Sequence, residues 1–135
     1  MTKKIYDIEG IGPSFANKLA KAKIKSVSGL LKKCAEKKGR ERTSEISGID
    51  ESQILKWTNM ADLYRVKGIG SEYAGLLKAS GVDTIKELRN RNAENLFQKI
   101  IKVNDENHFV RLVPKPNTLR EFINKARDLE PVITH

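Results

Sequence analysis

The sequence predicts an all-α fold made of two small helical units that are related by an internal repeat. Three observations lead to this fold class. Apolar residues recur at spacings of three and four, residues that cap helices stand before these runs, and one segment matches another 58 positions further on. An apolar share of 39% and a charged share of 32% are typical of a folded globular chain of 135 residues.

The internal repeat divides the chain. The segment IEGIGPSFANKL, which begins at Ile8, aligns without a gap with VKGIGSEYAGLL, which begins at Val66. The spaced apolar positions continue to agree as far as Leu30 and Leu88. Chance explains this agreement poorly. We therefore expect one helical unit in residues 1–63 and a second in residues 64–135, which ends with an additional helix.

The first unit is expected to contain three helices, each preceded by residues that favour a helix start. The first helix is expected to start at Ser14 or at the Gly12-Pro13 pair, and the second at Ser26 or Ser28. The third is expected to start at Asp50, which forms a capping box with Gln53. The second helix is expected to run down near Gly39. The apolar faces carry Phe15 and Leu19, then Leu30 and Cys34, and then Ile54, Trp57 and Met60.

The second unit repeats this organisation with different caps. Its first helix would carry Tyr73, Ala74 and Leu77 on its apolar face. Later helix starts are expected at Thr84 with Glu87, at Asn92, and at Thr118 with Glu121. Residues 105–117 contain two prolines and are expected to form an extended connector on the surface. Nothing else in the sequence suggests a strand.

A Gly-Ile-Gly motif occurs once in each copy, at residues 10–12 and 68–70. Glycine permits backbone conformations that are closed to residues with a Cβ, so two helices can meet through a very tight turn. The central residue, Ile11 or Ile69, would hold the turn in the core. Because the turn precedes a helix, its free N–H groups would point outward together. With the helix dipole, such a group of donors suits a phosphate oxygen.

These residues resemble the helix-hairpin-helix superfamily, which occurs in DNA repair enzymes, ligases and recombinases. The resemblance implies two tandem helix-hairpin-helix units of the SAM-like type. The segment Ile46-Ser47-Gly48-Ile49, followed by a helix, is similar to the second hairpin in the N-terminal domain of archaeal and eukaryotic recombinases. Nearly the whole chain, including the central LKWTNMADL, resembles a bacterial family catalogued as domain of unknown function 4332. That family carries no established activity.

The superfamily's pattern implies which residues would face a nucleic acid. They are Gly10, Gly12 and Ser14 in the first copy, and Gly68, Gly70 and Ser71 in the second. Lysines would add positive charge, namely Lys18 and Lys21 in the first copy and Lys67 and Lys78 in the second.

Some residues depart from the pattern of DNA-binding members. Ser14 and Glu72 stand where those members often have a basic residue. Asp7 and Glu9 place negative charge beside the first motif, and Pro13 removes one N–H donor. Two interpretations therefore stay open: the hairpins contact phosphate, or they serve only the architecture.

Positive charge is spread over the whole chain. The net charge is +9, and residues 1–63 hold 13 lysines and arginines against 8 acids, while residues 64–135 hold 13 against 9. This balance favours a polyanionic partner. The densest basic stretch, residues 32–42, is interpreted either as a phosphate grip or as a solvated helix end whose cations stabilise a helix C-terminus.

Other residue types point away from catalysis and metal binding. Trp57 lies at helical spacing with Ile54 and Met60, so a core role is favoured over base stacking. Cys34 is the single cysteine and shares an apolar face, so neither a disulfide nor a multi-cysteine zinc site is expected. The two histidines are far apart. No catalytic constellation, cofactor motif or metal cluster is evident, and no enzyme activity or small-molecule substrate is expected.

The sequence thus predicts a non-enzymatic protein of the cytoplasm that binds nucleic-acid backbone, with DNA as its expected partner and with little sequence preference. No apolar run approaches the roughly 18 residues that a membrane span needs, and no signal peptide is evident. The alternative is a protein–protein interaction adaptor in which the hairpins are purely structural. The two differ in salt dependence, because only backbone binding weakens steeply as salt rises.

Overall fold

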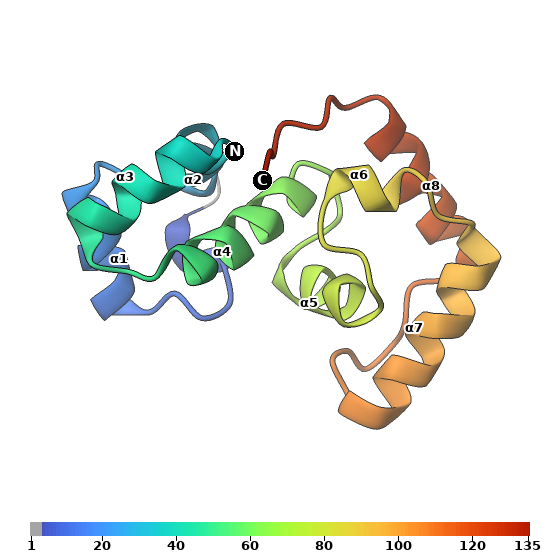
Figure 1. The fold of residues 1–135 in the computed structure, drawn as a ribbon. Coiled ribbons are helices and arrows are strands. Elements are labelled where there is room, and N and C mark those ends of the chain that lie inside the picture. Colours follow the sequence, from blue (N-terminus) through green and yellow to red (C-terminus); the bar gives the residue numbers. More distant parts are fainter. Residues whose placement is uncertain (1–3) are drawn as a thin grey trace. The chain divides into compact units, whose positions relative to one another are not determined.

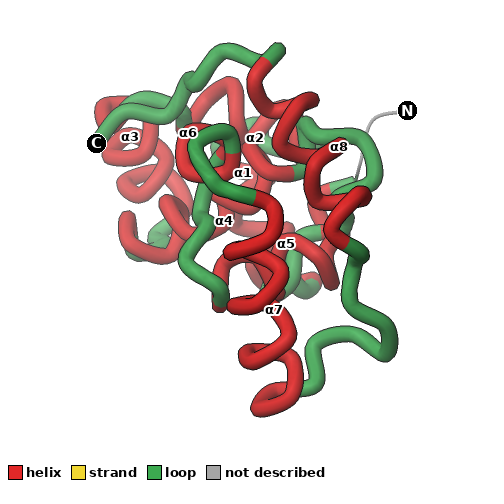
Figure 2. The backbone as a smooth tube through the Cα atoms, turned by 90° about the vertical axis from the view of Figure 1, so that its right-hand side faces the viewer, coloured by secondary structure: helices red, strands yellow, loops and turns green. Residues whose placement is uncertain are grey.

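The chain folds into helices joined by loops (Figure 1), and the computed structural model describes residues 4–135. The helices are the 3-10 helix η1 (Ile5–Asp7), α1 (Pro13–Lys21), α2 (Val27–Cys34), α3 (Lys37–Ser47), α4 (Glu51–Leu63), α5 (Ser71–Ala79), α6 (Ile85–Leu88), α7 (Ala93–Asn107) and α8 (Pro116–Arg127). Residues 4–135 contain no strand (Figure 2); they contain an isolated antiparallel bridge between Lys4 and Ser26. The predicted all-α class is confirmed.

Two compact units make up the described part of the chain. The first takes in the chain as far as Asp62 and again Val132–His135, and the second is Leu63–Pro131. In the first unit, α3 packs against α1 and α2. In the second unit, α7 packs against α5 and α8, and α6 packs against α8. Each unit therefore buries apolar surface between its own helices.

Side-chain caps begin three of the helices where the sequence predicts them. The Ser26 hydroxyl accepts a hydrogen bond of 3.0 Å at the start of α2, and the Asn92 side chain accepts one of 3.0 Å at the start of α7. Thr84 and Glu87 form the predicted capping box of α6. Each cap satisfies a backbone N–H that has no partner within the helix.

Proline is the first residue of both α1 and α8. Of the two predicted starts for α1, the Gly12-Pro13 pair is the one observed, with Gly12 as the N-cap. The predicted start at Thr118 is wrong, because α8 already begins at Pro116. The fixed φ of proline suits the first helical position, where a missing N–H costs no hydrogen bond.

The helix α3 has no counterpart among the predicted helices, and it begins where the second predicted helix was expected to end. The helix α2 ends at Cys34 and not near Gly39. The buried face of α3 carries Arg40, Thr43 and Ser47. The Ser47 hydroxyl donates to the Thr43 carbonyl at 2.6 Å, and the Cys34 thiol donates to the Thr43 hydroxyl at 3.5 Å. Because this buried face is polar, α3 has no apolar periodicity that would have revealed it.

A buried arginine connects α3 with the end of α2 and with the C-terminal residues. Arg40 is 4% exposed. Its guanidinium donates to the carbonyl oxygens of Cys34 and Ala35, each at 2.9 Å, and to that of Thr134 at 2.5 Å. The N–H of Thr134 donates to the Ala35 carbonyl at 2.9 Å. These bonds hold Thr134 in the first unit and provide the partners that a buried charge requires.

An aromatic pair, one ring buried and the other half-buried, packs within each unit. The ring centroids of Phe15 and Trp57 are 5.0 Å apart with an interplanar angle of 67°, and those of Tyr73 and Phe122 are 6.1 Å apart at 56°. Tilted and edge-to-face arrangements of this kind are favourable for aromatic rings. Trp57 is 1% exposed, which confirms its predicted core role. Its ring is therefore not a surface on which a base can stack.

Cys34 is expected to be unreactive in the folded protein. Burial raises the pKa of its thiol, and the thiolate is the form that attacks thiol reagents. At pH 8 we expect an aromatic disulfide reagent to label native Cys34 at least about 100-fold more slowly than the urea-unfolded chain, because labelling requires opening of the core. Equal rates in the two states would contradict the burial of this side chain.

Candidate nucleic-acid interface

The two Gly-Ile-Gly turns have the same backbone conformation. The first glycine has a φ of 95° at Gly10 and of 102° at Gly68. The second glycine has φ and ψ of −98° and −170° at Gly12 and of −108° and −165° at Gly70. Each second glycine is the N-cap of a nine-residue helix, α1 or α5. The turns therefore present the same backbone groups at the start of two separate helices.

The first glycine of each turn is required by the architecture. A positive φ is strained for any residue with a Cβ. A Cβ on Gly10 would lie 3.3 Å from the Nε1 atom of Trp57, and a Cβ on Gly68 would lie 2.9 Å from the Cε1 atom of Phe122. Each turn thus rests directly on an aromatic ring of its own unit.

The architecture does not require glycine at the second position of either turn. Gly12 and Gly70 have an ordinary φ, and a Cβ built on either would have no described atom within 4 Å. At the start of α1 and of α5, the N-cap residue makes no side-chain hydrogen bond. The first backbone N–H groups of both helices therefore lack the capping oxygen that Ser, Thr, Asp or Asn would supply.

The structure brings a lysine to the second turn that the sequence did not reveal. The Nζ atom of Lys125, on α8, lies 3.3 Å from the carbonyl oxygen of Lys67. Both lysines are exposed, as is Glu72 in the first turn of α5. Lys125 is far from the motif in the sequence, and only the packing of α8 places it beside the turn. Two cations and one carboxylate therefore border the second turn.

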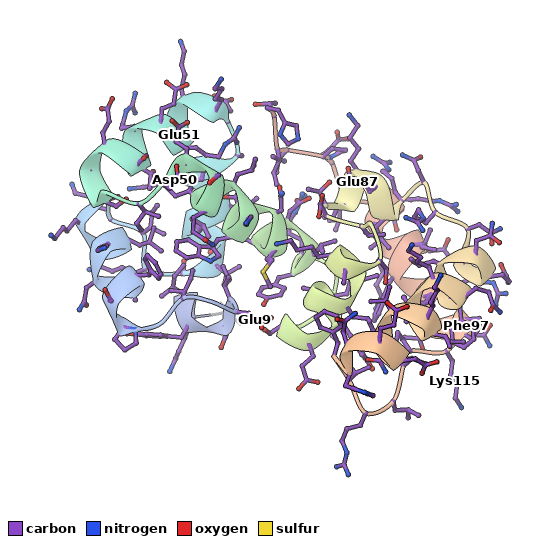
Figure 3. All side chains as sticks on the ribbon, turned by 60° about the horizontal axis from the view of Figure 1, so that its bottom comes forward. Glu9, Asp50, Glu51, Glu87, Phe97 and Lys115 are labelled. Carbon is purple, nitrogen blue, oxygen red and sulfur yellow. The ribbon has the colours of Figure 1, made fainter. Side chains whose placement is uncertain are left out.

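The first turn is less favourable for an anion. The Nζ atom of Lys18 lies 5.5 Å from the centroid of the Phe15 ring, one turn into α1. Asp7 and Glu9 are exposed on the approach to this turn, and Figure 3 labels Glu9 in the loop before α1. Pro13 occupies the first position of α1 and has no N–H to donate. This turn therefore has fewer donors and more negative charge beside it.

Two of the predicted lysines lie away from the turns. Lys21 is seven residues beyond Ser14, in the last turn of α1. Lys78 is seven residues beyond Ser71, in the last turn of α5. At a rise of 1.5 Å per residue they lie about 10 Å along the helix from those serines. The structure thus groups Gly70, Ser71 and Lys67 at the second turn, and it separates Lys78 from them.

The basic stretch of residues 32–42 spans two helices and the short loop between them. Lys32 and Lys33 are in the last turn of α2, where cations favourably face the helix dipole. Arg40 is buried, whereas Lys37, Lys38 and Arg42 on α3 are exposed. The stretch is therefore not a single solvated surface.

Among the described residues, neither a cluster of metal-ligating side chains nor a membrane-spanning helix is found. Within residues 4–135, no three His, Cys, Asp or Glu side chains come together as metal ligands. No helix in that part of the chain is both long enough and apolar enough to cross a bilayer.

This is an all-α protein whose two units each carry a Gly-Ile-Gly turn at a helix start. The chain belongs to the family described as "Domain of unknown function (DUF4332)", which matches residues 9–129. No curated protein and no solved structure matches the chain.

Proposed function

We propose that this protein is a non-enzymatic helix-hairpin-helix module of the cytoplasm that binds the phosphate backbone of DNA through its Gly-Ile-Gly turns. The observation that carries the proposal is the open space at Gly70 and Gly12, each at the start of a helix without a side-chain cap. A phosphate oxygen from outside the chain would accept from the free N–H groups, and the helix dipole would favour its negative charge. A side chain at either glycine would obstruct this approach.

The second turn is the stronger of the two proposed contacts. All three first positions of α5 carry an N–H group, whereas Pro13 removes one from α1. Lys67 and Lys125 add positive charge at the second turn, while Asp7 and Glu9 oppose an anion at the first. Contacts of this kind read the backbone and not the bases, so little sequence preference is expected.

Replacing Gly70 with aspartate is expected to separate stability from binding. The carboxylate would cap the N–H groups of α5 from within, and φ and ψ at this position already suit an N-cap residue. We expect the free energy of unfolding to stay within about 0.5 kcal/mol of the wild-type value or to rise. The affinity for a random-sequence duplex should fall at least about tenfold, because the phosphate loses its donors and meets a negative charge.

Fluorescence anisotropy with a labelled duplex measures this effect, and thermal unfolding followed by circular dichroism measures stability. Gln98→Glu, on an exposed position of α7, is the matched control for the added negative charge. The equivalent Gly12→Asp variant should have the smaller effect. If the Gly70→Asp protein binds the duplex as well as the Gln98→Glu protein does, the turns do not bind phosphate and have only a structural role.

Salt dependence provides a second test of the proposal. If about three phosphates are neutralised, the affinity for duplex DNA should fall about 40-fold between 50 and 200 mM salt, following a slope of about 0.9 per phosphate. The measurement is the same anisotropy titration at a series of salt concentrations. A flat dependence would exclude backbone binding.

The competing proposal is a protein–protein adaptor. Leu112, in the connector before α8, is 76% exposed, and we assign it to the surface through which an adaptor would contact its partner. Binding through that surface would change little with salt. Leu112→Ser would weaken an adaptor and leave duplex binding intact.

A further inference from the structure

The first unit contains a cavity whose charged lining is entirely basic. The cavity has a volume of about 320 Å³ and lies where the end of α1 meets α2 and α3. Its main lining residues are Lys21, Lys23, Lys33, Gly39, Arg42 and Ile46. We call it the α1–α3 pocket. Figure 1 shows these three helices together in the blue-to-turquoise part of the chain.

One face of α3 forms a wall of this pocket. Gly39, Arg42, Thr43 and Ile46 all line it, and their spacing of three and four residues places them on the same side of the helix. The two acids of α3, Glu41 and Glu45, are not among the lining residues. The lining therefore brings four cations together without a carboxylate.

A lysine already bonds to one of the backbone carbonyls beside the pocket. The C-terminal carbonyls of a helix carry partial negative charge and would repel one. At the end of α1, the Nζ atom of Lys33 donates to the Ala22 carbonyl at 2.9 Å, which gives one of these carbonyls a cationic partner and holds the lysine at the pocket. Gly39 leaves the wall without a side chain. The volume falls at the lower end of the roughly 300–1,000 Å³ that small-molecule sites occupy.

The chemistry of the lining selects a particular ligand class. Four cations favour a ligand with more than one negative charge, and the guanidinium of Arg42 matches the geometry of phosphate oxygens. Ile46 is 50% exposed at the same cavity and offers apolar contact to the rest of the ligand. We propose that the α1–α3 pocket is a second phosphate-binding site, which holds the phosphate groups of a nucleotide, either free or within a strand.

This site is separate from the Gly-Ile-Gly turns. Lys21 lies about 10 Å along α1 from Ser14, so a single phosphate does not reach both places. Phosphate binding at the pocket can therefore be tested independently of phosphate binding at the turns.

Paired variants of equal charge test the pocket. Lys21→Gln/Arg42→Gln removes two lining cations from exposed positions, and Lys37→Gln/Lys38→Gln removes two exposed cations of α3 that do not line it. Binding of inorganic pyrophosphate is measured by isothermal titration calorimetry at about 50 mM salt, and binding of a random-sequence duplex by anisotropy. Circular dichroism checks that both variants remain folded.

We expect the pocket variant to lose at least about tenfold in affinity in one of the two assays, while the control variant stays within about twofold. A specific loss of pyrophosphate binding identifies a free nucleotide or polyphosphate as the ligand source. A specific loss of duplex binding identifies strand phosphates.

The proposal is overturned if neither assay distinguishes the two variants, or if the wild-type protein binds neither probe. Gly70→Asp, measured alongside, keeps the two proposals apart. Loss of duplex binding in Gly70→Asp with equal behaviour of the lysine and arginine variants would retain the turns and reject the pocket. The reverse result would retain the pocket and reject the turns.

Discussion

Replacing Gly39 with alanine is expected to lower the free energy of unfolding by about 3 kcal/mol or more. A Cβ on Gly39 would lie 1.9 Å from the carbonyl oxygen of Lys33 and 3.1 Å from its carbonyl carbon. Both atoms belong to the backbone of α2, so no side-chain rotation relieves the clash. The helices α2 and α3 would have to separate, which would strain the bonds that Arg40 and Thr43 make to Cys34.

Intrinsic helix propensity predicts the opposite sign for this substitution. Alanine inside a helix is favoured over glycine by about 1 kcal/mol when nothing else changes. The free energy of unfolding of Gly39→Ala, measured by urea denaturation, therefore shows whether helix propensity or the packing of α2 against α3 has the larger effect. Lys38→Ala, the exposed neighbour on α3, serves as the control and should be nearly neutral. A Gly39→Ala protein as stable as wild type would show that α2 and α3 are not so closely packed.

The two glycines of the second turn are expected to respond very differently to alanine. Gly68→Ala should lower the free energy of unfolding by about 2–4 kcal/mol, because it combines a strained φ of 102° with a Cβ 2.9 Å from the ring of Phe122. Gly70→Ala should cost only about 1 kcal/mol or less, since its φ is ordinary and its surroundings are open.

Thermal and urea unfolding of the two variants measure this contrast directly. Equal destabilisation would contradict the assignment of Gly68 to the architecture and of Gly70 to the exposed helix start. The contrast also decides which variant informs about binding. A loss of DNA binding in Gly68→Ala would reflect disruption of the turn, whereas Gly70 can be changed while the fold remains.

Helices with an apolar face and a capping residue were predictable from the sequence. The starts at Ser26, Thr84 and Asn92 depend on local hydrogen bonds between residues a few positions apart, which a linear pattern contains. The helix α3 was not predictable in this way. Its buried face is stabilised by Arg40, whose partners include a carbonyl 94 positions away in the chain. The spacing of apolar residues along the sequence gives no information about such a distant partner.

The candidate site shows the same division between local and distant information. The motif itself predicted the position of both turns, because glycine spacing is a local property. The different roles of Gly68 and Gly70 were not evident, since they depend on the ring of Phe122 from a distant helix. Lys125 and the α1–α3 pocket were missed for the same reason. Each is assembled by helix packing from residues that are separated along the chain.

The hydrogen bonds that join Thr134 to Arg40 and Ala35 have a consequence for the order of events during translation. The ribosome makes residues 63–131 before it makes Thr134, so the whole second unit is synthesised before the first unit acquires its last hydrogen bonds. Of the three carbonyl partners of Arg40, those of Cys34 and Ala35 are synthesised with the first unit. The first unit therefore acquires these hydrogen bonds only after the second unit has been synthesised, whereas domains generally fold as units with the N-terminal one first.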